Sequence, residues 1–303
     1  MDFRLYPLRF SFLALETIHF PPGRSSNILR GAFGLIFRRI ACVPQCTGAR
    51  GCEFRATCPY RRMFEPAAIA GGPSGLGDWP RPFVFRATHL DGRTFAAGES
   101  FYFDLNLFDL DSQAVGYLVL AFTQLAREGL GSGRSRVELK SVTQLDEEGN
   151  AFVSREGMPA MQISLDTPAT AIAKVRVLFR TPTELKSGQQ LAPRPEFSIL
   201  AARVRDRIGT LRELYGDGPL KIDFRAFGER ASGVRMNRCD ITQVEMVRRS
   251  SRTGLVHPIG GFVGEAEYEG DLTEFIPYLR AARWTGVGRQ TVWGKGEVAL
   301  ECL

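Results

Sequence analysis

The sequence predicts an α+β fold made of two tandem ferredoxin-like (RRM-like) domains. Its 303 residues, 44% of them hydrophobic, suffice for two cores of ordinary size. Strand-like and helix-like periodicities follow one another in the order βαββαβ in each half. Both halves also end alike, because AREGLGSGRSRVEL and ARWTGVGRQTVWGKGEV each predict a helix, a Gly-x-Gly-Arg turn and a strand. This likeness suggests an internal duplication.

The first domain is predicted to span residues 1–145. Its first helix is clearly indicated, because Leu29, Phe33, Ile36 and Phe37 recur at helical spacing and form one apolar face. Apolar alternation and β-prone composition predict the strands. The elements expected in order are a strand over 4–18, a helix over 26–41, strands over 82–89 and 101–108, a helix over 115–125 and a strand over 136–145.

A linker rich in Gly, Ser and Pro is predicted over residues 146–171, and a second domain over 172–303. The polar segment SSRTGLVHP predicts the tip of a hairpin, and Asp271 is expected to cap a short helix. The elements expected in order are a strand over 173–180, a helix over 196–215, strands over 236–248 and 261–268, a helix over 271–280 and a C-terminal strand.

The charge distribution predicts a nucleic-acid partner. The net charge is +6, and residues 174–303 carry 21 basic and 16 acidic groups. Of the 39 basic residues, 34 are Arg. The planar guanidinium group of Arg forms bidentate hydrogen bonds with phosphate and stacks on bases. The alternative interpretation is a GC-rich genome that uses Arg wherever any cation will serve.

No segment approaches the roughly 18 consecutive apolar residues that a membrane-spanning helix needs. The first ten residues, MDFRLYPLRF, alternate in polarity like a strand and do not resemble a signal peptide. We therefore expect a cytoplasmic protein without a membrane partner or a small-molecule cofactor.

A glycine-rich segment near the C-terminus is a candidate for RNA binding. Closely spaced glycines let backbone N–H groups approach a phosphate, nearby cations supply charge, and a tryptophan can stack on a base. A tight helix-to-strand turn that needs glycine is the alternative. The residues assigned to RNA binding are Gly286, Gly288, Arg289, Trp293, Gly294, Lys295 and Gly296, together with Arg134 in the corresponding turn of the first half.

GGFVGEAEYEGDL, followed by a predicted helix and GVGRQTVWGKGEV, resembles the C-terminal domain of the CRISPR precursor-RNA processing endoribonucleases, a family of the RAMP superfamily. RSSRTG, over residues 249–254, resembles that family's hairpin tip. In the N-terminal half the resemblance is carried by ILRGAFG at residues 28–34, by CPYRRMFEP at residues 58–66 and by the order of elements.

The resemblance implies two ferredoxin-like domains and a substrate, the repeat of a CRISPR transcript, as a stem-loop or a single strand. It also implies metal-independent cleavage, in which the 2′-hydroxyl attacks the adjacent phosphate and leaves a cyclic phosphate and a free 5′-hydroxyl. No cofactor is then expected for catalysis. Such a reaction needs an acid, a base and cations around the phosphorane.

Histidine suits the acid and base roles, and the chain has three: His19, His89 and His257. The resemblance favours His19, because the family's catalytic histidine lies in or beside the first helix, although the helix itself contains no histidine here. His257 ranks second, because it lies beside the arginines of the hairpin. His89, before an Asp-Gly turn, is interpreted as a surface residue.

The hairpin arginines are expected to bind phosphates. Arg248 and Arg249 are assigned to RNA binding, and Arg252 to stabilising the transition state. The alternative is a solvated hairpin tip.

Four cysteines, Cys42, Cys46, Cys52 and Cys58, fall within 17 residues and form a cysteine-rich insertion over about 42–66. Because adjacent disulfides are not expected in the cytoplasm, the cluster predicts a metal site. We expect structural zinc, with an iron–sulfur cluster as the alternative.

Two other function classes remain open. One is a non-catalytic RAMP subunit that binds guide RNA inside a CRISPR effector complex, which the scarcity of histidines favours. The other is a zinc-dependent nucleic-acid enzyme, which is disfavoured because no His or carboxylate joins the cysteines to leave an open metal position.

Overall fold

The computed structural model describes residues 1–42, 46, 52–66, 79–109, 112–131, 133–154, 157–249 and 256–303. The chain forms two compact units, described here separately. The N-terminal unit comprises residues 5–161, and the C-terminal unit comprises residues 1–4 and 162–303. None of the helices within these described ranges is both long and apolar enough to cross a bilayer.

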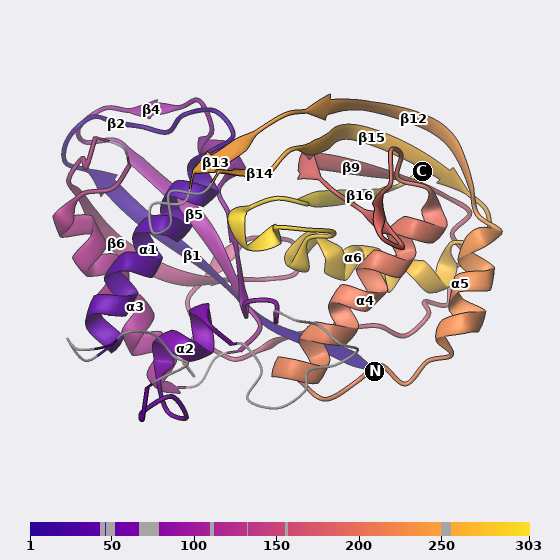
Figure 1. Cartoon of the computed structure of the whole chain (residues 1–303), viewed down its shortest axis with the longest axis horizontal. Helices are drawn as coiled ribbons and strands as arrows, with labels where there is room; N and C mark the ends of the chain where they lie inside the picture. The colour runs from indigo at the N-terminus through magenta and orange to yellow at the C-terminus, as the bar shows by residue number, and fades with distance from the viewer. Residues whose placement is uncertain are drawn as a thin grey trace. The chain divides into compact units, whose positions relative to one another are not determined.

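The N-terminal unit contains an antiparallel sheet in the order β3-β5-β1-β6-β7, with α1 and α3 on one face (Figure 1). Among its main strands the second, third, first and fourth in chain order therefore lie side by side. Its elements are β1 (Asp2–Ala14), β2 (Ile18–His19), α1 (Ser25–Ala41), α2 (Pro59–Phe64), β3 (Phe83–Arg86), a 3-10 turn (Thr88–Leu90), β4 (Thr94–Phe95), β5 (Ser100–Leu107), α3 (Ser112–Glu128), β6 (Val137–Leu145) and β7 (Ala151–Phe152).

Aromatic side chains form the core between this sheet and its helices. Phe33 of α1 stacks on Phe122 of α3 with ring centroids 4.8 Å apart. Phe122 also contacts Phe10 of β1 at 4.4 Å and Phe103 of β5 at 5.3 Å. All four side chains are fully buried. The predicted apolar stripe of the first helix is thus the stripe that packs into the core.

A distant carboxylate caps the first helix. The backbone N–H and the hydroxyl of Ser25 both donate to Asp91 Oδ1, at 2.9 and 2.5 Å. Arg24, at the N-cap position, makes no side-chain capping hydrogen bond. The helix start therefore depends on the turn after β3, 66 residues away in sequence.

The C-terminal unit contains a four-stranded antiparallel sheet in the order β12-β15-β9-β16. This is again second, third, first, fourth in chain order. Its elements are β8 (Met161–Ser164, paired with β1), β9 (Lys174–Thr183), β10 (Lys186–Ser187), β11 (Gln190–Leu191), α4 (Phe197–Tyr215), α5 (Phe224–Ser232), β12 (Arg235–Val244), β13 (Val247–Arg249), β14 (Val256–Pro258), β15 (Gly261–Glu269), α6 (Ile276–Thr285) and β16 (Val298–Cys302), with 3-10 turns at Thr273–Phe275 and Thr291–Trp293.

Three local predictions need correction in this part of the chain. Helix α5 was not expected, and Asp223 caps it by accepting from the N–H groups of Arg225 and Ala226 at 2.9 Å. Asp271 does not cap α6, because a 3-10 turn intervenes and Phe275 occupies the N-cap position without a side-chain bond. The predicted linker contains two short strands, β7 and β8, and so is not a plain loop.

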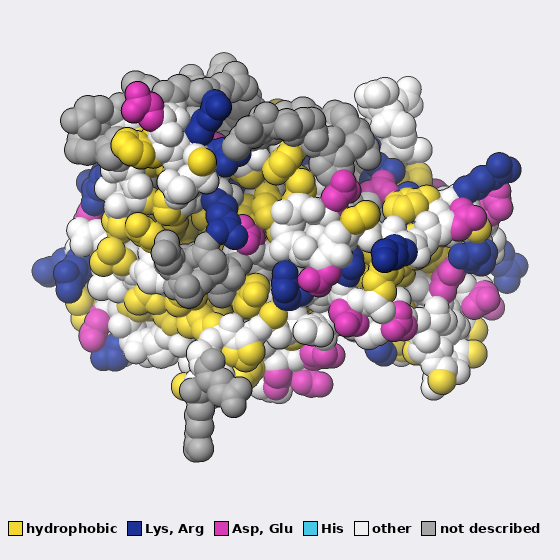
Figure 2. All heavy atoms as spheres, turned by 90° about the horizontal axis from the view of Figure 1, so that it is seen from below, with side chains coloured by type: hydrophobic (Ala, Val, Ile, Leu, Met, Phe, Trp, Pro, Cys, Tyr) yellow, Lys and Arg dark blue, Asp and Glu magenta, His cyan; other side chains and the backbone are white. Residues whose placement is uncertain are grey.

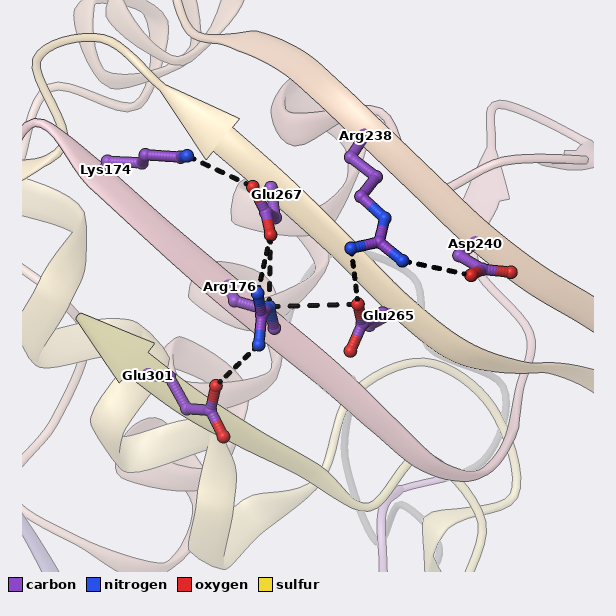
Figure 3. Close-up of polar contacts among 7 residues, drawn as sticks. All are labelled: Lys174, Arg176, Arg238, Asp240, Glu265, Glu267 and Glu301. Carbon is purple, nitrogen blue, oxygen red and sulfur yellow. Dashed lines mark hydrogen bonds and ion pairs between the residues drawn. The ribbon is translucent and has the colours of Figure 1, made fainter. Parts of the chain in front are cut away.

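One face of the C-terminal sheet carries an ion-pair network (Figure 3). Arg176 of β9 lies at its centre, with Nη2 2.8 Å from Glu267 Oε1 and Nη1 3.3 Å from Glu301 Oε2. Lys174 also pairs with Glu267, at 3.2 Å, while Glu265 links Arg176 to Arg238 of β12. This stretch of the sheet therefore presents paired charges, and not the aromatic platform on which RRM sheets stack bases.

Replacing Arg176 with methionine is expected to destabilise the C-terminal unit, because three carboxylates would lose their shared cation. Hydrogen bonds from Arg176, then from Lys174, lower the pKa of Glu267. The stabilisation from Glu267 is therefore fully present when the pH is above 4.5, the ordinary pKa of a glutamate in the unfolded chain. It is lost as the pH falls through the lower pKa that Glu267 has in the folded protein. Urea midpoints of wild type and variant should differ at pH 7 and converge below 4.5.

Arg225→Met is the matched control, because the Arg225 side chain is 90% exposed and pairs only with Glu229 among the described ion pairs. Its urea midpoint should stay close to wild type. Equal midpoints for Arg176→Met and wild type at pH 7 would show that the network contributes nothing to stability.

Candidate functional site

His19 lies on the exposed face of a two-stranded ribbon of the N-terminal unit, whose other face is buried through Ile18 and Phe95. Strand β2 pairs with β4 so that His19 is opposite Thr94. The two side chains meet, with His19 Nδ1 2.9 Å from Thr94 Oγ1. The imidazole is solvent-exposed, and its Nε2 atom takes part in none of the hydrogen bonds found among the described residues. The ring is therefore oriented on one side and accessible on the other, as an acid or base for an external ligand requires.

The Gly-x-Gly-Arg turn of the first half lies against this ribbon. Ser135 Oγ donates to the Thr17 carbonyl oxygen at 2.8 Å. A Cβ atom on Gly131 would lie 3.7 Å from the His19 carbonyl oxygen. The turn is closed by a pair of hydrogen bonds between the backbones of Leu130 and Ser135, at 2.9 and 3.0 Å. The structure thus brings residues 129–131 and 133–135 next to the strand that carries His19.

Three arginines lie in segments next to this ribbon. Arg93 precedes Thr94 in β4, with its guanidinium over the Phe95 ring at 4.9 Å, and Arg134 lies exposed in the turn with φ of 50°. Arg24 is exposed just before α1. None of these three makes an ion pair with the residues that the structure describes, whereas Arg136 is paired with Glu16. Their charges are therefore available to an anion.

The structure brings the C-terminal hairpin and the glycine-rich segment together. Strands β13 and β14 place Arg248 opposite His257 in the ladder, with Arg249 as the next position. Gln290 Nε2 donates to the Pro258 carbonyl oxygen at 2.9 Å, which ties the glycine-rich segment to the base of the hairpin. Arg252 lies outside the described residues. Two sequence-predicted RNA-binding segments thus meet within one unit.

The glycines of this segment are required by backbone packing. Gly286, Gly288, Gly294 and Gly296 all have positive φ. A Cβ on Gly288 would lie 2.2 Å from the Glu184 carbonyl oxygen, and a Cβ on Gly296 would lie 1.9 Å from that of Val287. This geometry favours the tight-turn interpretation of the glycines.

The charged and aromatic members of the segment differ in exposure. Arg289 is exposed and pairs with Glu184, with Nη1 3.2 Å from Oε2. Trp293 is half-buried. Lys295 is only 3% exposed, and its Nζ lies 3.3 Å from Met246 Sδ. The assignment of Lys295 to RNA binding is therefore corrected, because its ammonium group is packed inside the unit and does not reach the surface.

The remaining histidine, His89, is exposed, as expected of a surface residue. Its ring stacks on Tyr102 at 4.4 Å, and its Nε2 lies 2.8 Å from the Tyr102 carbonyl oxygen. Arg9 covers the Tyr102 ring at 3.9 Å while pairing with Asp104. Both contacts of the His89 ring are therefore made with one residue of the same unit, Tyr102.

The cysteine cluster is only partly assembled. Burial, a hydrogen bond with Cys46 and interactions with Cys58 raise the pKa of Cys42 to about 12, so these three residues lie near one another. Among the described residues, however, no group of three or more His, Cys, Asp or Glu side chains is arranged to hold a metal ion. The zinc prediction therefore finds no support in the geometry.

The overall positive charge is not gathered into one patch on the face shown in Figure 2. There, Lys and Arg side chains are interspersed with Asp and Glu side chains and with hydrophobic areas. Any anion bound on that face must therefore be recognised locally and not by an extended basic surface.

The site contains residues that sequence reasoning missed. Thr94 and Arg93 lie 75 and 74 positions after His19, and nothing in a short stretch of unremarkable residues marks them as partners of that histidine. The ribbon β2–β4, two residues per strand, is too short for a periodicity signal.

Two family models match the sequence, one in each half. Residues 3–165, more than half of the chain, match the family model AF_1859_N, described as an N-terminal domain. Residues 177–298 match the model of the CRISPR-associated endoribonuclease Cas6. No curated protein matches the sequence.

Solved Cas6 structures share the fold. A Thermus thermophilus Cas6 superposes with a TM-score of 0.57 at 16% identity, covering 98% of each chain. A product complex of Cas6 gives 0.59 at 17% identity, covering 99% of this chain and 100% of that one. A partial Cas6-RT-Cas1–Cas2 complex gives 0.59 at 11% identity, covering 99% of this chain and 46% of that one. The chain therefore belongs to the family that the AF_1859_N model describes, its residues 177–298 match the Cas6 CRISPR endoribonuclease model, and its fold is that of solved Cas6 structures.

Proposed function

We propose that this chain acts in the cytoplasm as a metal-independent endoribonuclease that cuts CRISPR repeat RNA into guide RNAs, leaving a cyclic phosphate. The observation that carries the proposal is His19, an exposed imidazole held by Thr94 beside arginines that have no ion-pair partner among the described residues. Two ferredoxin-like domains are part of the proposal, supported by the second-third-first-fourth strand order in both sheets.

The hydrogen bond to Thr94 is compatible with either step of the reaction. If His19 Nδ1 carries the proton and donates to Thr94 Oγ1, then Nε2 has a free lone pair and can remove the proton of the 2′-hydroxyl. If Thr94 donates to Nδ1, then Nε2 carries the proton and can deliver it to the 5′-oxygen that leaves. Arg93 and Arg134 would stabilise the charge that develops on the phosphorane.

RNA binding is proposed to involve the hairpin and the exposed part of the glycine-rich segment. Their junction at Gln290 and Pro258 supports this, since it joins two candidate contact regions in one unit. Arg248, Arg249 and Arg289 would bind phosphates, with Arg252 and His257 at the hairpin as the remaining candidates. Solved Cas6 relatives include a product complex, and another forms part of a Cas6-RT-Cas1–Cas2 complex. A larger CRISPR assembly is accordingly a candidate partner.

The cleavage assay uses purified protein in EDTA with RNA repeats from its own genome. We expect one cut at a defined position, with a cyclic phosphate on the upstream product and a hydroxyl on the downstream one. Tight binding of several repeats without cleavage would instead support the guide-RNA-binding subunit. Cleavage that EDTA abolishes would reject the metal-independent mechanism.

Replacing Thr94 with valine is expected to lower the cleavage rate roughly 10-fold to 100-fold, because the imidazole would lose its orienting partner while the β-branched shape is kept. Thr94→Ser retains the hydroxyl and should restore most of the rate. Single-turnover cleavage measures both variants, together with RNA affinity, which should not change. A Thr94→Val enzyme with full activity would remove Thr94 from the mechanism.

A structural zinc on Cys42, Cys46, Cys52 and Cys58 also remains a proposal. It rests on the sequence alone, in which the four cysteines fall within 17 residues. A bound ion would have to displace the proton from the Cys42 thiol. Elemental analysis of protein purified without added metal should find about one zinc per chain. If neither zinc nor iron is found, the proposal is wrong.

A further inference from the structure

The C-terminal unit contains a cavity that the proposed cleavage site does not use. Its volume is about 520 Å³, and all of its lining residues belong to that unit. It opens where the last turn of α4, the connection to α5 and α5 itself meet the start of α6. A cavity of this size falls within the range of small-molecule sites, roughly 300–1,000 Å³.

A buried arginine lines this cavity, and no acidic partner for it is found in the described part of the chain. Arg212 is only 6% exposed, and its Nε donates to the Gly218 carbonyl oxygen at 3.2 Å. Its Nη1 atom is buried and has no hydrogen-bond partner among the residues that the structure describes. No carboxylate among the described residues lies within ion-pair distance of its guanidinium. An uncompensated buried cation is costly, so a ligand that supplies the missing negative charge would offset that cost.

The cavity's own carboxylates are already engaged. Asp217 faces Arg4, with a separation of 3.6 Å, and Glu274 accepts from Arg230 Nε at 2.5 Å and from its Nη2 at 2.9 Å. Asp166 pairs with the amino group of Met1 at 2.6 Å. These acids are therefore compensated by cations other than Arg212.

A cation without an ion-pair partner in the described ranges and two aromatic rings also line the cavity. Lys221 is exposed at the cavity and makes no ion pair within the described part of the chain. Phe227 and Tyr278 are 3% and 5% exposed, with ring centroids 5.3 Å apart. Two cations beside an aromatic wall match a phosphate group attached to a planar base.

We propose that this cavity binds a phosphate ester of nucleotide size, with Arg212 and Lys221 holding the phosphate and Phe227 and Tyr278 lining the space for the base. The same chemistry is offered by a free nucleotide and by the terminal phosphate of an RNA strand. The proposal concerns binding alone and does not depend on the cleavage reaction.

Isothermal titration of the full chain tests it with four probes: inorganic phosphate, AMP, and a short oligoribonucleotide with and without a 5′-phosphate. We expect saturable binding of AMP, of the phosphorylated RNA or of both, and none of the unphosphorylated RNA at this cavity. Binding of AMP would identify a free nucleotide as a ligand, and binding of the phosphorylated RNA alone would identify a strand end.

Variants of the cavity residues, compared with a variant outside the cavity, show whether the probes bind there. Arg212→Gln should weaken the affinity about 10-fold to 100-fold, which is the effect of losing a charge-assisted hydrogen bond. Lys221→Gln should weaken the affinity as well. Because Lys221 is exposed, this variant should fold normally, so its result does not depend on whether Arg212→Gln folds. Arg225→Gln on α5 removes the same charge outside the cavity and should bind like wild type.

The proposal is overturned if no probe binds saturably, or if Arg212→Gln and Lys221→Gln bind as tightly as wild type. Repeat cleavage is measured in parallel and should be unchanged in Lys221→Gln. Failure of the cavity to bind phosphate is thereby distinguished from failure of the proposed nuclease.

Discussion

Replacing His19 with alanine is expected to reduce repeat cleavage by about 10²–10⁴-fold, the usual contribution of a positioned acid or base. The imidazole is exposed, is oriented by Thr94 and is the histidine nearest in sequence to α1. Because it lies on the surface of a two-residue strand, its removal should leave the core and the folding stability unchanged. Single-turnover cleavage, with circular dichroism to check folding, measures the effect.

Two further histidine variants serve as comparisons. His89→Ala should cleave like wild type, because His89 is an exposed histidine of the same unit whose ring is engaged with Tyr102. His257→Ala tests whether His257 of the hairpin, the second candidate, is needed for cleavage. Full activity in His19→Ala combined with loss in His257→Ala would move the catalytic role to the C-terminal unit.

Replacing Gly296 with alanine is expected to destabilise the C-terminal unit by more than about 3 kcal/mol. The added Cβ would lie 1.9 Å from the Val287 carbonyl oxygen, and φ at this position is +66°. The overlap is with backbone, so no side-chain rotation can relieve it. The hydrogen bond from Val287 N–H to the Gly296 carbonyl oxygen, 2.9 Å long, would break as the turn opens. Urea unfolding measures the loss.

Gly218→Ala is the matched control for this change. Gly218 also has positive φ, +87°, but an added Cβ would meet nothing within 4 Å. It should therefore cost only the conformational penalty, about 1 kcal/mol. If the two variants are equally stable, the glycine-rich segment is not a packed turn. Reduced RNA affinity in Gly296→Ala at unchanged stability would then revive the phosphate-cradle interpretation.

Equivalent turns in the two units explain why both halves of the sequence contain a similar Gly-x-Gly-Arg segment. Leu130 N–H donates to the Ser135 carbonyl oxygen, just as Val287 N–H donates to that of Gly296. Each bond closes a connection between a helix and the strand that follows it, α3 to β6 in one unit and α6 to β16 in the other. The glycine pattern was visible in the sequence because positive φ selects glycine whatever the surroundings.

Lys295 shows the limit of reading charge from sequence. A lysine between two glycines predicts an exposed phosphate ligand, yet the side chain is buried against Met246, 49 residues away. Burial depends on which distant element packs over a position, and no local pattern encodes that. The same reason hid Arg212, a helix residue whose significance comes from the lack of an acidic partner for it among the described residues around the cavity.

The long elements and the family followed from the sequence by itself, because a 3.6-residue or two-residue apolar period and a glycine-rich motif are local properties of the chain. Helix α5 was missed. The tertiary structure alone decided which residues meet: Asp91 at the start of α1, Thr94 at His19, and the hairpin at the glycine-rich segment. These contacts join positions from 32 to 75 residues apart. Their partners are chosen by how strands pair and pack, a property of the folded chain and not of any short segment.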